Sequence, residues 1–248
     1  MAPVRHRRQP TKVTNDRPDS AVHERTGSGL DLYQAMSTQR TVRRLRPDPI
    51  PDDVLERVLQ AACWAPTGGN QQPWRVVVVT DDEGKAGLQA IYQPEWDRYV
   101  AGFMARLEGL PEEQLAPWRK IAAAGDHLAQ HLAEAPAVLV FCADPSQMAI
   151  TDARLDRISI VGGGSVYPAV QNLLLACVAE GLGCAITTLH CRREDEVRAL
   201  LDIPDGWATA AMVPIGYPVL GGHGPITRQP PARLAHRDRF GAPWPGVS

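Results

Sequence analysis

Residues 65–74 read Ala65-Pro66-Thr67-Gly68-Gly69-Asn70-Gln71-Gln72-Pro73-Trp74. An apolar helical pattern stops at Pro66, and the β-branched run 75–80 that follows predicts a buried strand. The two glycines free the backbone to approach a flat ligand closely. The amides of Asn70 and Gln72 can donate to and accept from ring heteroatoms or hydroxyl groups. The segment is therefore either a ligand-binding loop or an Asn/Gly-rich connector.

Upstream of this loop, Arg40, Arg43 and Arg44 lie together with Thr41, directly after the first predicted helix. Guanidinium groups bind a phosphate monoester with charge-assisted, often bidentate hydrogen bonds. Thr41 adds a hydroxyl and a backbone N–H. A solvated basic turn is the alternative interpretation of this segment.

Downstream, Thr187-Thr188 ends a predicted strand, and Arg228 follows the Gly216-Tyr217-Pro218 motif. Backbone N–H groups at a strand end can face a cofactor ring, although β-branched residues need no such role in a strand. Arg228 lies in a Pro/Gly-rich segment, where it either binds a ligand or is simply solvated. The glycine triplet 162–164 lacks the Lys-Ser/Thr ending of a phosphate loop and is interpreted as a hinge.

Helical and strand patterns alternate along most of the chain, which predicts a layered α/β or α+β domain. Strands are predicted at 75–80, 137–142, 184–188 and 208–216, and helices at 30–40, 54–62, 165–180 and 194–201.

Residues 84–135 carry a helical but irregular pattern, with expected interruptions at Pro94, Pro111 and Pro117. We interpret the insertion near 92–120 as a lid. Asp52 is expected to cap the helix that follows it, and the Pro- and Arg-rich chain after Pro230 predicts an extended arm.

The composition of the 248 residues is that of an ordinary globular protein, with a net charge of −2 that does not point to nucleic acid. Residues 1–28 hold six arginines and lysines against three acidic residues and no apolar run, which predicts a disordered basic tail. Arg7-Arg8 is not followed by the apolar segment of an export signal. No window approaches a membrane span, so a cytoplasmic location is expected.

The five cysteines form no CxxC pair and lie in apolar surroundings, which predicts reduced thiols and no metal site. The adjacent His190-Cys191 pair lacks an orienting partner, so we do not expect it to act as a catalytic dyad. No Ser/His/Asp set or pair of carboxylates is evident, and the sequence therefore predicts no dedicated acid–base catalytic residue.

The order of the motifs in this chain resembles that of the FMN-dependent nitroreductase family over most of residues 30–240. The motifs are, in order, Arg40–Arg43, the loop 65–74, the apolar helix ending in Gly-Leu-Gly, Gly216-Tyr217-Pro218 and the motif at Arg228. The wider superfamily includes iodotyrosine deiodinase and the enzyme that fragments FMN to dimethylbenzimidazole. The resemblance implies an α+β fold of α/β/α layers with a central, mostly antiparallel sheet. It also implies one FMN-binding domain over 29–248 and a homodimer with FMN at the interface and C-terminal arm exchange.

The same resemblance implies the cofactor-binding residues. The FMN phosphate and ribityl chain would be held by Arg40, Thr41, Arg43 and Arg228. The isoalloxazine would be lined by Pro66, Thr67, Gly68 and Asn70, and Gln72 would reach the ring edge or the ribityl chain. Near N5 and O4 of the ring would lie Thr187 and Thr188. Gln39 stands where many relatives have another arginine, and Thr67 replaces a commoner serine. The Glu, Tyr and Lys set of the deiodinase lid is not matched convincingly by Glu95, Tyr99 and Lys120, so deiodination is not expected.

The resemblance further implies that NAD(P)H delivers hydride to the flavin N5 and then leaves, so that a nitroaromatic or quinone acceptor takes its place in a ping-pong sequence. Two alternatives remain open: oxygen-dependent fragmentation of the flavin, and a flavin-binding protein without catalysis.

Overall fold

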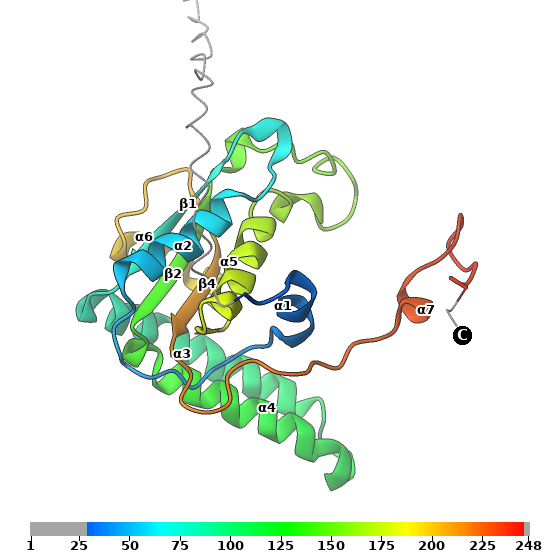
Figure 1. Cartoon of the computed structure of the whole chain (residues 1–248), viewed down its shortest axis with the longest axis horizontal. Coiled ribbons are helices and arrows are strands. Elements are labelled where there is room, and N and C mark those ends of the chain that lie inside the picture. Colours follow the sequence, from blue (N-terminus) through cyan, green and yellow to red (C-terminus); the bar gives the residue numbers. More distant parts are fainter. Residues whose placement is uncertain (1–28, 246–248) are drawn as a thin grey trace, which may run out of the picture.

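The structure, a computed structural model, describes residues 29–245, so the basic tail predicted at 1–28 lies outside the described residues. Its centre is a sheet of four strands: β1 (Trp74–Val79), β2 (Ala137–Ala143), β3 (Gly183–Cys184) and β4 (Ala208–Gly216). All neighbours are antiparallel, in the order β1-β2-β4-β3. Figure 1 labels β1, β2 and β4 of this sheet.

The alternation of side chains along β2 divides the core into two layers. Leu139 and Phe141 belong to one buried cluster, while Val138 and Val140 belong to a second cluster on the other face of the sheet. Every residue of β2 is buried, as expected of a strand covered by helices on both faces. The α/β/α layering and the antiparallel sheet predicted above are confirmed.

One face of the sheet is covered by α2 (Asp52–Cys63) and α5 (Tyr167–Ala179), which pack against each other. Gly181, with φ of 72°, follows α5 and supplies the left-handed backbone that ends a helix. The prediction that Asp52 caps α2 is wrong. Pro51 occupies the cap position without a side-chain hydrogen bond, and Asp52 is the first helical residue, where its charge still favours the N-terminus.

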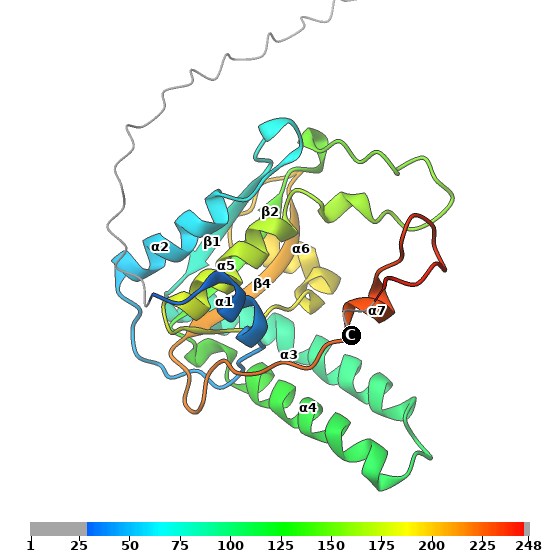
Figure 2. The same cartoon turned by 45° about the vertical axis from the view of Figure 1, so that its right-hand side comes forward.

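The other face carries α3 (Asp82–Ala105), α4 (Glu112–Gln130), α6 (Glu194–Leu200) and the 3₁₀ helix η5 (Leu189–Arg193). The helices α3 and α4 form a hairpin that projects beyond the sheet (Figure 2). Pro111 interrupts the helical pattern as predicted, since it is the N-cap of α4 and follows the end of α3, but Pro94 and Pro117 lie inside helices and do not interrupt them. In α3, burial of Tyr92 and Trp96 on both sides of Pro94 stabilises the helix against the missing N–H.

The two helices of this hairpin approach each other closely at Gly125. A Cβ atom there would lie 2.1 Å from the Trp96 ring, whose Nε1 donates to Asp126 at 2.7 Å and so is held in place. We expect Gly125→Ala to lower the free energy of unfolding by about 1–3 kcal/mol through overpacking, measured by urea denaturation. Gly102→Ala, with nothing within 4 Å of its Cβ, should be neutral or stabilising by up to about 1 kcal/mol. Equal effects at the two positions would contradict the close approach.

The strand β3 is shorter than predicted because of its partner on β4. Ala185 faces Pro214 and donates to its carbonyl at 3.3 Å, but a proline has no N–H to donate in return. Regular pairing therefore stops after Cys184. It returns only at Thr187 and Met212, which exchange two hydrogen bonds of 2.9 Å.

The ends of the described chain lie outside the layers. The helix α1 (Leu32–Thr38) is capped by Asp31, whose carboxylate accepts from the Tyr33 N–H at 3.1 Å. The segment after β4 extends away from the sheet and contains one short helix, α7 (Pro231–Leu234), in agreement with the predicted arm (Figure 1). No helix within residues 29–245 is long and apolar enough to cross a membrane.

Candidate functional site

The basic segment after α1 is fixed to the edge of the sheet. The Val42 N–H donates to the Cys184 carbonyl at 2.8 Å, and the Val42 side chain is buried. Leu45 forms an isolated β-bridge with Pro218. These contacts explain why Arg40, Thr41 and Arg43 lie beside the strand that leads to Thr187.

The surroundings of Tyr92 on α3 include Thr187 and the charge of Arg43. Burial raises the pKa of the Tyr92 phenol, while a hydrogen bond with the Thr187 side chain and the charge of Arg43 act in the opposite direction. Arg43 is half-buried, and burial lowers its pKa. No carboxylate in residues 29–245 forms an ion pair with it, so a partly desolvated cation faces this position without a counter-charge. We call Arg43, Tyr92 and Thr187 the Arg43 group.

Arg40 is bound to the segment that leads from β4 to the arm. Its Nε donates to the Gly222 carbonyl at 2.9 Å, and its backbone N–H donates to His223 Nδ1 at 3.3 Å. His223 Nε2 in turn lies 2.8 Å from the Leu182 carbonyl. Because the Arg40 N–H only donates and the Leu182 carbonyl only accepts, the imidazole accepts at Nδ1 and donates at Nε2. It therefore joins the segment after β4 to the basic segment and to the turn after α5. Thr41 is exposed next to Arg40.

Arg228 is not brought to this group within one chain. Its side chain is exposed, and its Nη1 donates to the neighbouring Thr227 carbonyl at 2.9 Å.

Thr187 and Thr188 differ in whether their backbone N–H groups are free to donate a hydrogen bond. The Thr187 N–H is used by Met212, whereas the Thr188 N–H has no acceptor in the described part of the chain. Thr188 also lines a cavity of about 300 Å³ with Tyr167 and Cys191. Of the two predicted residues, Thr188 therefore has the free donor.

The glycine-containing loop is held in an unusual backbone conformation. Gly69, Asn70 and Gln72 have φ values of 57°, 53° and 48°. The Gln72 N–H donates to the Thr67 hydroxyl at 3.0 Å, and the Gly68 N–H donates to the Ser165 hydroxyl at 3.3 Å. Left-handed backbone at a non-glycine residue is costly and concentrates at ligand-binding positions, and asparagine tolerates it better than glutamine.

This strain gives a direct test. Gln72→Gly and Gln72→Ala both remove the amide, but only glycine relieves the positive φ. We expect the glycine variant to be more stable than the alanine variant by about 1 kcal/mol, measured by urea denaturation. Equal stabilities would show that the backbone at residue 72 is not strained.

Within one chain, the predicted site residues lie in two separate groups. The loop that carries Pro66, Thr67, Gly68, Asn70 and Gln72 follows α2 and packs on Ser165 at the start of α5. The basic segment lies at the opposite end of the sheet, beside β3 (Figures 1 and 2). Among residues 29–245 of one chain, no hydrogen bond or ion pair joins the two groups.

His190 is fully buried and the neighbouring Cys191 is partly buried. Burial lowers the pKa of His190 to about 4 and raises that of the Cys191 thiol, so neither group is activated. The sulfur lies 3.6 Å from His190 Nε2. All five cysteines are free thiols, and no cluster of three or more His, Cys, Asp or Glu side chains within residues 29–245 fits a metal ion.

Two residues of the site were not predicted from the sequence. Tyr92 has the periodicity of a core residue, with Leu88 and Ile91 on the same stripe, so nothing local marks it. His223 lies in the sequence Gly221-Gly222-His223-Gly224, and this pattern does not show which groups the imidazole contacts.

Comparison with known proteins gives the same assignment as the motifs. The chain is 31% identical to a NADH dehydrogenase of Thermus thermophilus over 205 residues, which cover 83% of this chain and 95% of that protein. It is 33% identical to a 5,6-dimethylbenzimidazole synthase of Rhodospirillum rubrum over 197 residues, 77% of this chain and 82% of that protein.

Among solved structures, oxidized iodotyrosine deiodinase bound to FMN and 3-iodo-L-tyrosine is similar, with a TM-score of 0.61 and 25% identity over 85% of this chain and 100% of that one. A sequence model described as the nitroreductase family matches residues 36–217, which is most of the chain. The protein therefore belongs to the nitroreductase family of oxidoreductases.

Proposed function

We propose that this protein is an FMN-dependent oxidoreductase that takes hydride from NAD(P)H and passes it to a flat acceptor such as a nitroaromatic or a quinone. The observation that carries the proposal is the Arg43 group, in which a half-buried guanidinium without a carboxylate partner in residues 29–245 acts on Tyr92, whose surroundings also include Thr187. When bound, FMN supplies the electron and hydride transfer.

The donor set fits a phosphate and a flavin ring. Arg57 is neutralised by Glu180 and Asp53 at 2.9 and 2.8 Å, whereas Arg40 and Arg43 have no such partner in the described chain. Arg40, Thr41 and Arg43 would hold the phosphate and ribityl chain, with Arg228 reaching it from the arm. The free Thr188 N–H would donate to the pyrimidine edge, where negative charge develops on reduction.

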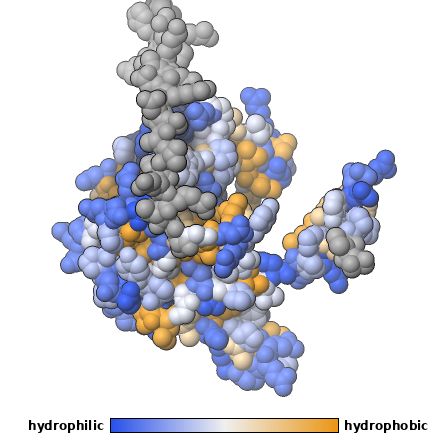
Figure 3. Space-filling model, viewed as in Figure 1, coloured by the Kyte–Doolittle hydropathy of each residue, from blue (hydrophilic) through white to orange (hydrophobic). Residues whose placement is uncertain are grey.

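The separation of the two residue groups is explained by a homodimer in which each site uses both chains. Pro66, Thr67, Gly68, Asn70 and Gln72 of one chain would line the ring held by the Arg43 group of the other. Large apolar side chains are exposed on α1, before α5 and on the arm: Leu32, Tyr33, Met36, Ile158, Ile160, Leu234 and Phe240. Apolar patches are visible on the face drawn in Figure 3. Exposed patches of this kind are typical of protein interfaces.

An anaerobic titration tests this function. The purified protein, reconstituted with FMN, is followed by its absorbance while NADPH or NADH is added. Bleaching of the flavin, followed by recovery of the oxidised spectrum when a nitroaromatic or quinone is added, supports the proposal. A bound flavin that neither donor bleaches contradicts it.

A second candidate, oxygen-dependent fragmentation of FMN, is favoured by the 33% identity to the dimethylbenzimidazole synthase. It predicts that reduced FMN is consumed in air. Binding of FMN without turnover or consumption would instead support a non-catalytic flavin-binding protein.

A further inference from the structure

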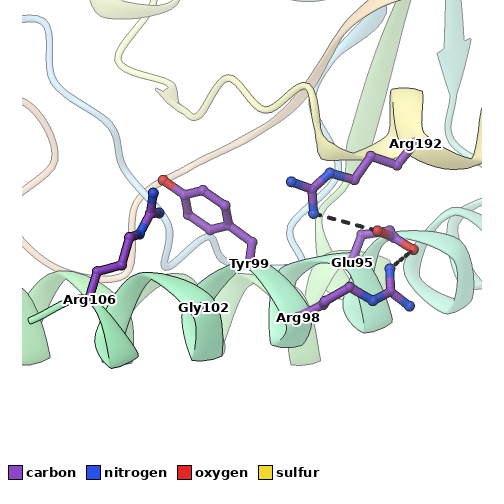
Figure 4. Close-up of a pocket in the computed structure, with 6 residues that line it drawn as sticks. All are labelled: Glu95, Arg98, Tyr99, Gly102, Arg106 and Arg192. Atoms are coloured by element: carbon purple, nitrogen blue, oxygen red, sulfur yellow. Dashed lines mark hydrogen bonds and ion pairs between the residues drawn. The ribbon is translucent and has the colours of Figure 1, made fainter. Parts of the chain in front are cut away.

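Two acidic side chains are buried within residues 29–245, those of Glu95 and Asp152. Glu95 on α3 accepts from Arg98 Nη1 at 2.5 Å through Oε1, and Arg192 Nη1 of η5 lies 3.7 Å from Oε2 (Figure 4). The charged partners of Glu95 are therefore arginine side chains of the two helices that pack there. Asp152 lies in the connection between β2 and α5, outside any helix or strand, and its burial has a different cause.

Both oxygens of the Asp152 carboxylate are used by the chain that follows it. Oδ2 accepts from the backbone N–H groups of Ile160 and Val161 at 2.8 and 3.3 Å. Arg157 Nη1 also donates to Oδ2 at 2.8 Å, and the Ser159 hydroxyl donates to Oδ1 at 2.8 Å. These bonds, that from the Ile160 N–H most of all, lower the pKa of Asp152 to about 2. The carboxylate is therefore ionised near neutral pH and accepts at both oxygens.

Apolar burial does not hold this loop in place. Residues 153–160 are all exposed, and the side chains of Ile158 and Ile160 are 90% and 77% exposed. Fixing the backbone of such a loop costs conformational entropy, which polar contacts must offset where apolar contacts are few. The carboxylate makes these polar contacts, so Asp152 is the residue that orders the loop.

The order that Asp152 imposes extends to the start of α5. The Ser159 hydroxyl, which donates to Asp152, also accepts from the Gly162 N–H at 3.2 Å. Gly162 belongs to the 3₁₀ helix η4 (Val161–Gly163), and Ser165 follows two residues after that helix. The carboxylate therefore fixes both the backbone at the start of η4 and the path of the chain toward Ser165.

Ser165 is the polar contact between the glycine-containing loop and the rest of the chain. Its hydroxyl accepts from the Gly68 N–H at 3.3 Å. Every other hydrogen bond made by residues 66–71 within the described chain stays inside the segment 66–72. The connection after β2 and the loop before β1 lie at the same end of the sheet (Figure 2). A displacement of Ser165 would thus release Gly68.

We propose that Asp152 is a positioning residue of the flavin site, whose carboxylate orders residues 152–161 and so holds Ser165 against Gly68. This inference rests on the proposed function, because it concerns the loop that would line the flavin ring. A loop that already has its binding geometry loses less conformational entropy when the ligand arrives. Loss of the carboxylate should therefore weaken FMN binding although Asp152 itself does not touch FMN.

The experiment is a double-mutant cycle on FMN affinity, measured by quenching of flavin fluorescence during titration of the apoprotein. Asp152→Ala and Ser165→Ala should each raise the Kd by about 3- to 10-fold, the size of one hydrogen bond. Because Asp152 acts through Ser165, the double variant should have the Kd of Ser165→Ala alone. Asp152→Asn keeps an oxygen for the Ile160 N–H and should restore part of the affinity.

Asp144→Ala is the matched control. The Asp144 carboxylate lies at the start of the same connection and accepts from the Ser146 N–H at 2.9 Å and from the Ser146 hydroxyl at 2.6 Å. In the described chain, no hydrogen bond leads from this side chain toward Gly68, so its loss should change the Kd by less than about 2-fold. Equal losses of affinity in Asp144→Ala and Asp152→Ala overturn the inference, since any disturbance of the connection would then suffice.

A second measurement does not require FMN. Hydrogen exchange of the Gly68 amide in the apoprotein should become faster in Asp152→Ala and in Ser165→Ala but not in Asp144→Ala. The inference is overturned by unchanged exchange or an unchanged Kd in Asp152→Ala, and also by losses of affinity that simply add in the double variant.

The exchange measurement also separates this inference from the proposed function. If the wild-type protein does not bind FMN, the proposed function fails, and exchange at Gly68 alone decides whether Asp152 holds the loop. If Asp152→Ala does not fold, Ser159→Ala takes its place in both measurements, because it removes the hydroxyl that joins Asp152 to Gly162.

Discussion

Replacement of Arg43 by methionine is expected to weaken FMN binding by about 10- to 100-fold, because a hydrogen bond to a charged group contributes about 1.5–3 kcal/mol. The guanidinium is half-buried beside Tyr92 and has no carboxylate partner in the described chain, so its attraction to a phosphate is less screened than at an exposed position. The measurement is a titration of the apoprotein with FMN, followed by quenching of flavin fluorescence.

The neighbouring Arg44 provides the control. It is exposed on the same segment, and its Nη1 lies 3.2 Å from His127 Nδ1. Arg44→Met removes the same charge one residue away and should leave FMN affinity within about 3-fold, as expected of an exposed charge. Equal losses in the two variants would mean that the segment acts only through its net charge.

Replacement of Leu32 and Met36 by glutamate is expected to convert the proposed dimer into a monomer and to abolish FMN retention. The two residues are exposed four positions apart on α1 and present one apolar face. Burial of unpaired carboxylates in an interface costs several kcal/mol. In a monomer, each residue group also lacks the complementary group that the other chain would supply. Light scattering after gel filtration gives the mass, and the flavin absorbance gives FMN per chain.

Met36 and Ile121 form a matched pair, since both side chains are 47% exposed. Ile121→Glu places the same charge on α4 and should leave the mass and the flavin content unchanged. A monomeric Leu32→Glu/Met36→Glu variant that retains FMN would show that one chain builds the whole site, against the proposed division between two chains.

The regular elements were predictable where the local pattern is strong. β4 spans 208–216 as predicted, and β2 extends one residue beyond the predicted 137–142. These segments are continuous apolar runs bounded by proline or glycine, so period and length alone identify them. Pro94 shows where prediction from the local sequence fails. The free-energy cost of a proline inside a helix is set against the burial of the residues around it, which the local sequence does not show.

The candidate site was predictable as a set of residues and not as an arrangement. The motifs at 40–43 and 65–74 place the chain in its family, and the assignment of their residues to a cofactor stays a prediction. Tyr92 and His223 were not predictable as site residues. The local sequence around a core-like tyrosine or a lone histidine is the same whether or not an arginine lies nearby in the fold. Their contacts join residues far apart in the chain, which no local pattern encodes.

The sequence by itself determined the strands, the helices that cover them, the family and the residue types available for a phosphate and a flat ring, since each of these follows from local patterns and side-chain chemistry. Only the tertiary structure decided which of these residues meet. The partner of Ala185 is a proline on β4 and so β3 ends early, Arg43 lies in a half-buried position beside Tyr92, and the loop at Gly68 lies at the other end of the sheet. These outcomes depend on which distant segments pack together, because burial and missing partners, and not residue identity alone, set the energy of a charge or a backbone group.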